Sequence, residues 1–427
     1  MCSPSPGHCA LGPVGQHGSF LHFHPDEQID HHLGVGGDVG HGGVPADRRV
    51  VVRPPGRVAG ADDDITLPGC LTDGGVSLGF AAARGVGHAS DLRLRAPWEG
   101  QDPAMDAPST GTPVRVGLVG AGGVGARHAR TLAGFPDVEL LGVTDAVPGA
   151  ADALAGELGV PVVEDVDRLL AQRLDGVWLC VPPFAHGELE LAAVRAGVPF
   201  FVEKPLATGV AVAEEVARAV AGAGLPTATG YHWRHLDTVA AARAVGAAHR
   251  PRLVSATWWD KVPPPAWWSR RERSGGQVVE QLTHVLDLAR LLAGEVAEVR
   301  ATAAPSTAEG RDVDDATAAL LAFESGAVGT VTAACSLPGK LAAGLDVVCD
   351  GAAVEFTETS LSVTTADGAQ RSEPRVDGRT AVDRAFVDVL AGGAAAEGLV
   401  GYAEALRTHR VAVAIAGSAR TGEAVRP

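Results

Sequence analysis

A short apolar stretch that runs directly into a glycine-rich turn constrains the fold of this chain most. Residues 114–119 (VRVGLV) predict a buried strand, residues 120–125 (GAGGVG) follow at once, and a helical pattern covers 126–132. In such a unit Gly120 allows the tight turn, Gly122 lets the backbone approach a pyrophosphate, and Gly125 permits close packing of helix on strand. The pattern predicts a dinucleotide-binding turn, with a glycine-rich loop of another α/β fold as the alternative. The candidate cofactor contacts are Gly120, Gly122, Gly123, Val124 and Gly125.

An acidic residue follows the second predicted strand at the spacing that such a turn requires. Residues 138–143 form this strand, and Asp145 lies 20 residues beyond Gly125, where a carboxylate would meet the adenosine ribose hydroxyls. Ala146 and Val147 come next, so neither Arg nor Lys stands there to receive a 2′-phosphate. The sequence therefore favours NAD over NADP.

Strand and helix patterns continue to alternate up to about residue 230. Such βαβ repetition predicts a doubly wound parallel sheet with ligands at the carboxyl ends of its strands. Two strand ends carry distinctive residues, Val181-Pro182-Pro183 and Glu203-Lys204-Pro205. The expected helices cover 166–172, 186–196 and 209–223, and the expected strands cover 176–181, 199–202 and a short stretch near 227.

The second half has a different pattern. Strand-like runs separated by turn signals, such as 324–326 (ESG) and 366–368 (ADG), are typical of an antiparallel sheet. Helices are expected from His284 to about 292, near 381–390 and over 402–419. The expected strands cover 296–302, 316–323, 327–334, 345–349, 353–356 and 361–365.

Three motifs together resemble the glucose-fructose oxidoreductase, inositol dehydrogenase and rhizopine-catabolism (GFO/IDH/MocA) family. They are the glycine turn, Val181-Pro182-Pro183 with His186, and above all 201–207 (FVEKPLA), and 274–287 (SGGQVVEQLTHVLD) looks like a fourth. The resemblance covers about 113–427. It implies a Rossmann-type NAD(P)-binding domain over 112–230 and an α+β domain with a large, mostly antiparallel sheet over 231–427. It also implies cofactor contacts from Val181, Pro182, His186, Glu203 and Lys204.

The family's second domain often mediates dimers or tetramers through the open face of its sheet, so a homodimer or homotetramer is expected. By resemblance, the last helix packs on the nucleotide-binding half.

Lys204 is one of only three lysines, with Lys261 and Lys340, in a chain that otherwise uses arginine. A lysine retained at a strand's carboxyl end indicates a compact ammonium that arginine cannot replace. An exposed lysine paired with Glu203 is the alternative. By resemblance, Lys204 hydrogen-bonds the substrate hydroxyl beside the nicotinamide.

Glu280 and His284 are four residues apart, so on one helix they would share a face. Oxidation of a secondary alcohol needs a base for the hydroxyl proton, and an imidazole suits that task, with a carboxylate to orient it. Lys204, His284 and Glu280 are the candidate catalytic residues. The family usually has aspartate where Glu280 stands, so its role as relay, substrate ligand or spectator is open.

Several aromatic and basic side chains are candidates for the substrate cleft. Tyr231 and Arg234 either line the cleft or pack between the domains. Trp258, Trp259, Trp267 and Trp268 gather around the proline-rich segment 263–265, read here as a loop, and indole faces suit the C–H faces of sugars and cyclitols. Trp267 and Trp268 are the candidates retained, although some of these indoles could fill a core.

Composition excludes other classes of protein. Asp and Glu outnumber Lys and Arg by 51 to 35, a net charge of −16 that argues against nucleic acid as a partner. No apolar run is long enough to cross a membrane and no signal-peptide pattern opens the chain, so a cytoplasmic protein is expected. The six cysteines form no CxxC pair, and no metal site is expected in the enzyme.

Residues 1–104 are rich in histidine, glycine and proline and show no sustained period. They are expected to be a disordered extension, or an over-extended reading frame if Met105 is the true start. The tract with His22, His24, His31 and His32 could instead be a metal site.

The sequence thus predicts an NAD-dependent oxidoreductase that acts on a CH–OH group of a sugar, cyclitol or related polyol. Three alternatives stay open: a redox-neutral member of the family, an imine-reducing member, and a protein that senses NAD without turnover.

Overall fold

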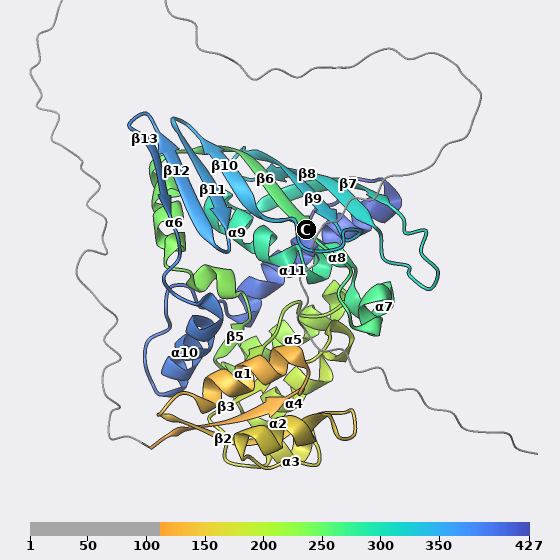
Figure 1. Ribbon diagram of the computed structural model, residues 1–427, viewed down its shortest axis with the longest axis vertical. Coiled ribbons are helices and arrows are strands. Elements are labelled where there is room, and N and C mark those ends of the chain that lie inside the picture. Colours follow the sequence, from red (N-terminus) through yellow and green to blue (C-terminus); the bar gives the residue numbers. More distant parts are fainter. Residues whose placement is uncertain (1–111) are drawn as a thin grey trace, which may run out of the picture. The chain divides into compact units, whose positions relative to one another are not determined.

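The computed structural model describes residues 112–427, which form a parallel sheet followed by a larger mixed sheet (Figure 1). The expectations about residues 1–104, Met105 and the histidine tract lie outside the described residues.

The first sheet is parallel throughout and has the strand order β2-β1-β3-β4-β5. The order changes direction between β1 and β3, which is where doubly wound sheets bind ligands. The predicted Rossmann-type architecture is confirmed. Its strands are β1 (Val114–Val119), β2 (Val138–Thr144), β3 (Gly176–Leu179), β4 (Phe200–Val202) and β5 (Thr227–Thr229), and its helices are α1 (Gly123–Ala133), α2 (Ala150–Leu158), α3 (Val166–Leu170), α4 (Glu188–Ala196) and α5 (Val210–Ala223).

The second sheet has eight strands in the order β13-β12-β11-β10-β6-β9-β8-β7, antiparallel except where β6 pairs with β9. This confirms the expected large, mostly antiparallel sheet. Its strands are β6 (Pro251–Trp259), β7 (Val296–Ala304), β8 (Ala316–Phe323), β9 (Val328–Ala334), β10 (Ala342–Cys349), β11 (Ala352–Thr357), β12 (Ser360–Thr365) and β13 (Gly368–Ser372).

The helices of the second half precede this sheet, interrupt it or follow it. They are η2 (His232–His235), α6 (Thr238–Ala248), η3 (Ala266–Ser269), α7 (Arg271–Ser274), α8 (Gln277–Glu280), α9 (Thr283–Ala293), α10 (Gly378–Leu390) and α11 (Tyr402–Thr421).

Strand β6 corrects the interpretation of Trp258 and Trp259 as part of a proline-rich loop. Both residues lie at the end of β6, which pairs with β10 on one side and β9 on the other. Val254, Ala256 and Trp258 point into the core with a period of two. This alternation is the sequence signal of a strand, but the prolines that follow it led to the interpretation as a loop. Helices α2 and α6 and strand β13 were also missed.

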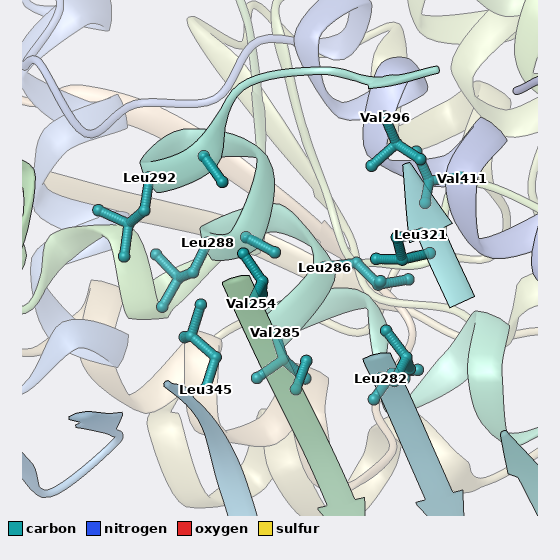
Figure 2. Packing of buried hydrophobic residues seen from close by; sticks show 14 of the residues in the cluster. Val254, Leu282, Val285, Leu286, Leu288, Leu292, Val296, Leu321, Leu345 and Val411 are labelled. Carbon is teal, nitrogen blue, oxygen red and sulfur yellow. The ribbon is translucent and has the colours of Figure 1, made fainter. Parts of the chain in front are cut away.

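Helix α9 is the centre of the second domain's core. Ten of its eleven residues are buried, and it lies between the sheet and α11. The apolar side chains of α9 pack into this core, while its polar residues Thr283, His284, Asp287 and Arg290 are buried as well. Figure 2 shows this packing around Val254, Leu282, Val285, Leu286, Leu288, Leu292, Val296, Leu321, Leu345 and Val411.

The opposite face of the large sheet exposes a row of apolar side chains. Val348 pairs with Leu253, and Leu253 pairs with Val328, so the three lie side by side across β10, β6 and β9. Each is between 41% and 55% exposed. The expectation of a homo-oligomer stays a prediction, because the structure describes one chain.

The last two helices return to the first sheet. Phe386 of α10 is buried with Trp178 and Phe201 of β3 and β4. Helix α11 contacts α5, and its Arg410 pairs with Glu214 at 2.8 Å. The two halves are therefore joined by the packing of α10 and α11 on the first domain, as well as by the chain that leaves β5.

Within residues 112–427, no helix combines the length and apolar character that a membrane crossing would need.

Leu286→Ala should destabilise the protein by about 2–5 kcal/mol, because the substitution leaves a cavity where α9 packs on the sheet. Thermal or urea denaturation measures the loss. Leu341→Ala is the matched control, since Leu341 is 70% exposed and its truncation should change stability by less than about 0.5 kcal/mol. Equal effects of the two substitutions would contradict the placement of this core.

Candidate active site

The glycine-rich turn connects β1 to α1 and has an open side. Gly120 has a φ of 97°, a conformation that residues with a side chain rarely adopt, and a Cβ there would lie 2.3 Å from the Cys180 carbonyl oxygen. At Gly125 a Cβ would lie 1.9 Å from the Gly120 oxygen. At Gly122 and Gly123, in contrast, a Cβ would meet nothing within 4 Å. The N-terminus of α1 therefore faces free space, which fits a pyrophosphate.

Asp145 holds this turn against the end of β2. Its carboxylate accepts a hydrogen bond from the Ala121 amide at 2.7 Å and another from the Val147 amide at 2.8 Å. The residue is half-buried, while Ala146 and Val147 are exposed. A carboxylate has lone pairs beyond these two bonds, so Asp145 can also accept from ribose hydroxyls beside the turn.

Val181 and Pro182 follow β3 and therefore lie at the carboxyl edge of the parallel sheet, as the glycine turn does. Both residues are half-buried. The predicted helix from His186 begins instead at Glu188, after a short 3-10 turn over Pro183–Ala185. His186 is buried, and its Nδ1 lies 2.5 Å from the Glu190 carboxylate. Glu190 also accepts from the Gly187 amide at 2.6 Å. Through Glu190, the His186 ring is therefore held at the N-terminus of α4.

Glu203, at the end of β4, is the centre of a buried charge network. His128 of α1 lies between two carboxylates: its Nε2 is 2.9 Å from Glu203 and its Nδ1 is 2.7 Å from Asp383 of α10. Asp383 also accepts from the Trp178 indole at 2.9 Å. All four side chains are nearly inaccessible, so the network is a buried bridge between α1, β3, α10 and the Glu203-Lys204 segment.

The charges in this network stabilise one another. Burial alone would lower the pKa of His128, but Asp383 and Glu203 outweigh that effect and raise it to about 9. Burial alone would raise the pKa of Glu203, but the hydrogen bond and charge of His128 lower it to about 2. The imidazolium and the Glu203 carboxylate therefore both stay charged at neutral pH.

Lys204 reaches from the first domain to the second. Its Nζ donates to the backbone oxygen of Glu280 at 2.8 Å and to the Glu280 carboxylate at 3.1 Å. The other carboxylate oxygen accepts from the Trp268 indole at 2.8 Å. The peptide bond between Lys204 and Pro205 is cis. Glu280 thus bridges the lysine and a fully buried tryptophan.

This arrangement corrects the expectation that Glu280 and His284 share a face of one helix. Helix α8 ends at Glu280 and α9 begins at Thr283. The break lies at Gln281 and Leu282, where the Leu282 amide donates to the carbonyl of Gln277, five residues back, at 3.2 Å. Glu280 consequently turns to Lys204 and Trp268, and neither carboxylate oxygen bonds His284 in the described residues.

His284 lies in an aromatic enclosure. Its ring stacks near-parallel to Trp233 and Trp258, with centroids about 6 Å away, and His232 lies 4.7 Å away, edge to face. The residue is only 5% exposed, and its Nδ1 has no hydrogen-bond partner among the described protein atoms.

The same surroundings set the protonation state of His284. Burial lowers its pKa well below the usual value, and the positive charges of Lys204, His232, Lys340 and Arg379 lower it further. The imidazole is neutral at pH 7 and can accept a proton.

Arg234 and Tyr231 have partners in the protein. Arg234 makes a two-pronged ion pair with Asp287 at 2.6 and 2.7 Å and also reaches Glu404 of α11. The Tyr231 hydroxyl lies 2.9 Å from Thr283, and its ring meets His284 edge-on. Arg234 therefore pairs within the second domain, with α9 and α11, and a place for Arg234 or Tyr231 in the substrate cleft stays a prediction.

The two retained tryptophans differ in exposure. Trp268 is fully buried and acts through its bond to Glu280. Trp267 is half-buried, with its ring edge-on to Phe184 in the segment after β3. Trp267 therefore bridges the two halves at the edge where the parallel strands end.

Five functional candidates escaped the sequence analysis. His128 and Asp383 are 255 residues apart, and Lys340, Glu358 and Arg379 come from separate loops and a helix start, so no local spacing links them. The one residue that could have been noticed is His128, which lies three residues after the last glycine of the turn. A lone histidine in a helix is usually structural, so its position did not mark it as functional.

The fold and its match to a family model define the class of protein, an oxidoreductase with an NAD-binding Rossmann domain. Residues 114–231 match the model of the oxidoreductase family with this fold, GFO/IDH/MocA, and residues 233–355 match the model of the family's C-terminal domain. The chain belongs to the GFO/IDH/MocA family.

Among individual proteins, the inositol 2-dehydrogenase of Rhizobium meliloti is 34% identical over 45% of this chain and 58% of its own length. The myo-inositol dehydrogenase Hyg17 of Streptomyces leeuwenhoekii is 29% identical over 72% of this chain and 98% of its own length. A levoglucosan dehydrogenase solved with NADH and levoglucosan has a TM-score of 0.67 at 22% identity, covering 74% of this chain and 99% of that one, and shows the likeness of fold.

His128→Gln should remove a pH-dependent part of the stability. A histidine whose pKa rises on folding stabilises the protein fully below its unfolded pKa of about 6.5, and this contribution is lost as the pH rises through about 9. At about 1.4 kcal/mol per unit it amounts to about 3 kcal/mol. Melting temperatures from pH 6 to 10 should show wild type and variant converging. His249→Gln, at a partly exposed histidine, is the control, and parallel curves for wild type and His128→Gln would contradict the network.

Proposed function

We propose that this protein is an NAD-dependent dehydrogenase that oxidises a secondary alcohol of a sugar, cyclitol or related polyol. The observation that carries the proposal is the meeting of Lys204, from the end of β4, with the segment that holds Glu280 and His284, beside the open glycine turn. The likeness to inositol dehydrogenases supports the substrate class.

The cofactor would lie along the carboxyl edge of the parallel sheet. The first-turn amides of α1 would receive its pyrophosphate, and Asp145 would accept hydrogen bonds from the adenosine ribose. Val181 and Pro182 would border its path toward Lys204. When bound, the nicotinamide supplies the hydride acceptor at C4.

The protein's own side chains would handle the proton. Lys204 would donate a hydrogen bond to the substrate hydroxyl and stabilise the negative charge that develops on that oxygen. His284 has an unpaired ring nitrogen, so it can accept a hydrogen bond from the substrate hydroxyl and would take its proton as the hydride leaves. The lowered pKa of this imidazole makes it a weak base until the surrounding positive charge is compensated. Glu280 would orient the Lys204 ammonium and keep it between the domains rather than act on the substrate itself.

Lys204→Ala should lower kcat by roughly 100-fold or more, the usual contribution of a positioned proton-handling group. NAD affinity should change little, because the pyrophosphate and ribose contacts lie at the glycine turn. NADH formation on a panel of inositols and sugars measures the first effect, and calorimetry with NAD measures the second. Lys261→Ala is the matched control at an exposed lysine. Near-normal turnover by Lys204→Ala would refute the assignment.

This panel also separates the alternatives. A dehydrogenase releases NADH in proportion to substrate consumed, whereas a redox-neutral enzyme releases none. A protein that only senses NAD would bind the cofactor without converting any polyol or imine.

Preference for NAD is part of the proposal. Asp145→Asn keeps an acceptor for the Ala121 amide but removes the negative charge that would repel a 2′-phosphate. Wild type should bind NAD more tightly than NADP, and the variant should narrow the ratio by roughly tenfold, or about 1.4 kcal/mol. Calorimetric titration of both cofactors checks this, and an unchanged ratio would contradict the role of Asp145.

A further inference from the structure

Three positively charged side chains and His232, from four separate parts of the chain, lower the pKa of His284. Lys204 follows β4, His232 lies in η2, Lys340 lies between β9 and β10, and Arg379 opens α10. The proposed reaction uses only Lys204. The other three have no assigned task, and His232 lies against the His284 ring.

A single carboxylate serves these three groups. Glu358, in the turn between β11 and β12, lies 3.2 Å from the His232 Nε2 and 3.7 Å from the Lys340 Nζ, and it also pairs with Arg379. The hydrogen bond from His232 lowers the pKa of Glu358 to about 2, with burial opposing and the other positive charges assisting. Glu358 therefore stays charged, but it supplies one negative charge against at least two positive ones.

The remaining positive charge is accessible. The side chains of Lys340 and Arg379 are 42% and 40% exposed, against 21% for Glu358. Lys204 does not add to this surplus, because Glu280 neutralises it. Lys340 and Arg379 can therefore meet a ligand while they keep their shared partner.

The position of Lys340 ties this charge to the reacting centre. Its ammonium lies 4.6 Å from the centroid of the Trp258 ring, and that ring lies near-parallel to His284 at 5.9 Å. A cation on an aromatic face is held by the ring's quadrupole. Lys340 therefore lies next to the enclosure of His284, and part of its side chain stays exposed.

An excess positive charge at this place opposes binding of an oxidised, positively charged nicotinamide. A negative group on the substrate would compensate it and would form charge-assisted hydrogen bonds with the lysine and the arginine.

We propose that the substrate is an anionic polyol, whose carboxylate or phosphate is bound by Lys340 and Arg379 while its hydroxyl lies between Lys204 and His284. This inference rests on the proposed dehydrogenase activity and narrows its substrate class.

The test compares neutral polyols with anionic counterparts. Methyl glucoside is paired with methyl glucuronide and glucose with glucose 6-phosphate, which keep the same secondary alcohols, and myo-inositol is paired with its monophosphate, which lacks only the hydroxyl that is esterified. The full-length protein should show kcat/KM at least tenfold higher for one anionic series, and the ratio should fall as ionic strength rises. Preference for the uronide or for the phosphates identifies the anion.

Lys340→Met should reduce the anionic preference about tenfold, mainly through KM, whereas Lys340→Arg should retain most of it. Arg379→Met should act in the same direction. Lys261→Met is the matched control, because it removes an exposed lysine outside this group.

The outcomes separate the two proposals. If neutral polyols are oxidised as well as or better than their anionic counterparts, or if Lys340→Met keeps the preference, the anionic substrate is refuted and the dehydrogenase stands. If NAD binds but no member of either series yields NADH, the dehydrogenase proposal fails and this inference fails with it.

Discussion

The site depends on how the end of β4 is held. Glu203 is hydrogen-bonded to a protonated His128, which is hydrogen-bonded on its other side to Asp383. This buried row of alternating charges fixes the residue that precedes Lys204. Each buried charge would be costly alone and is tolerated because its neighbour compensates it. Since Asp383 belongs to α10, a segment far along the chain completes the support of the first domain's functional edge.

In the second domain, too, partly buried carboxylates compensate the charges of nearby basic side chains. Glu280 binds Lys204 and a buried indole, while Glu358 is shared by His232, Lys340 and Arg379. His284 differs because aromatic rings and positive charges surround it, which keeps it neutral. One imidazole in the molecule is thus held charged and another is held neutral, and their surroundings decide which.

The local sequence pattern was sufficient to predict those features that depend only on where strands, turns and helices begin and end. The parallel sheet, the open turn at Gly120–Gly125 and the placement of Asp145 and Lys204 at strand ends follow from periodicity and from residues adjacent in the sequence. Pattern failed at β6, where prolines after Trp259 suggested a loop, and at α8–α9, where Gln281 and Leu282 interrupt an apparently continuous helix.

The sequence by itself determined the fold class, the family and the identity of the main chemical groups, because strand and helix periods and short motifs are encoded locally. Only the tertiary structure decided what those groups do to one another: that Glu280 serves Lys204 instead of His284, that Arg234 pairs with Asp287, and that Lys340 lies over Trp258. The physical reason is that protonation and ion pairing depend on burial and on charges within a few ångströms, and these neighbours come from residues far apart in the chain.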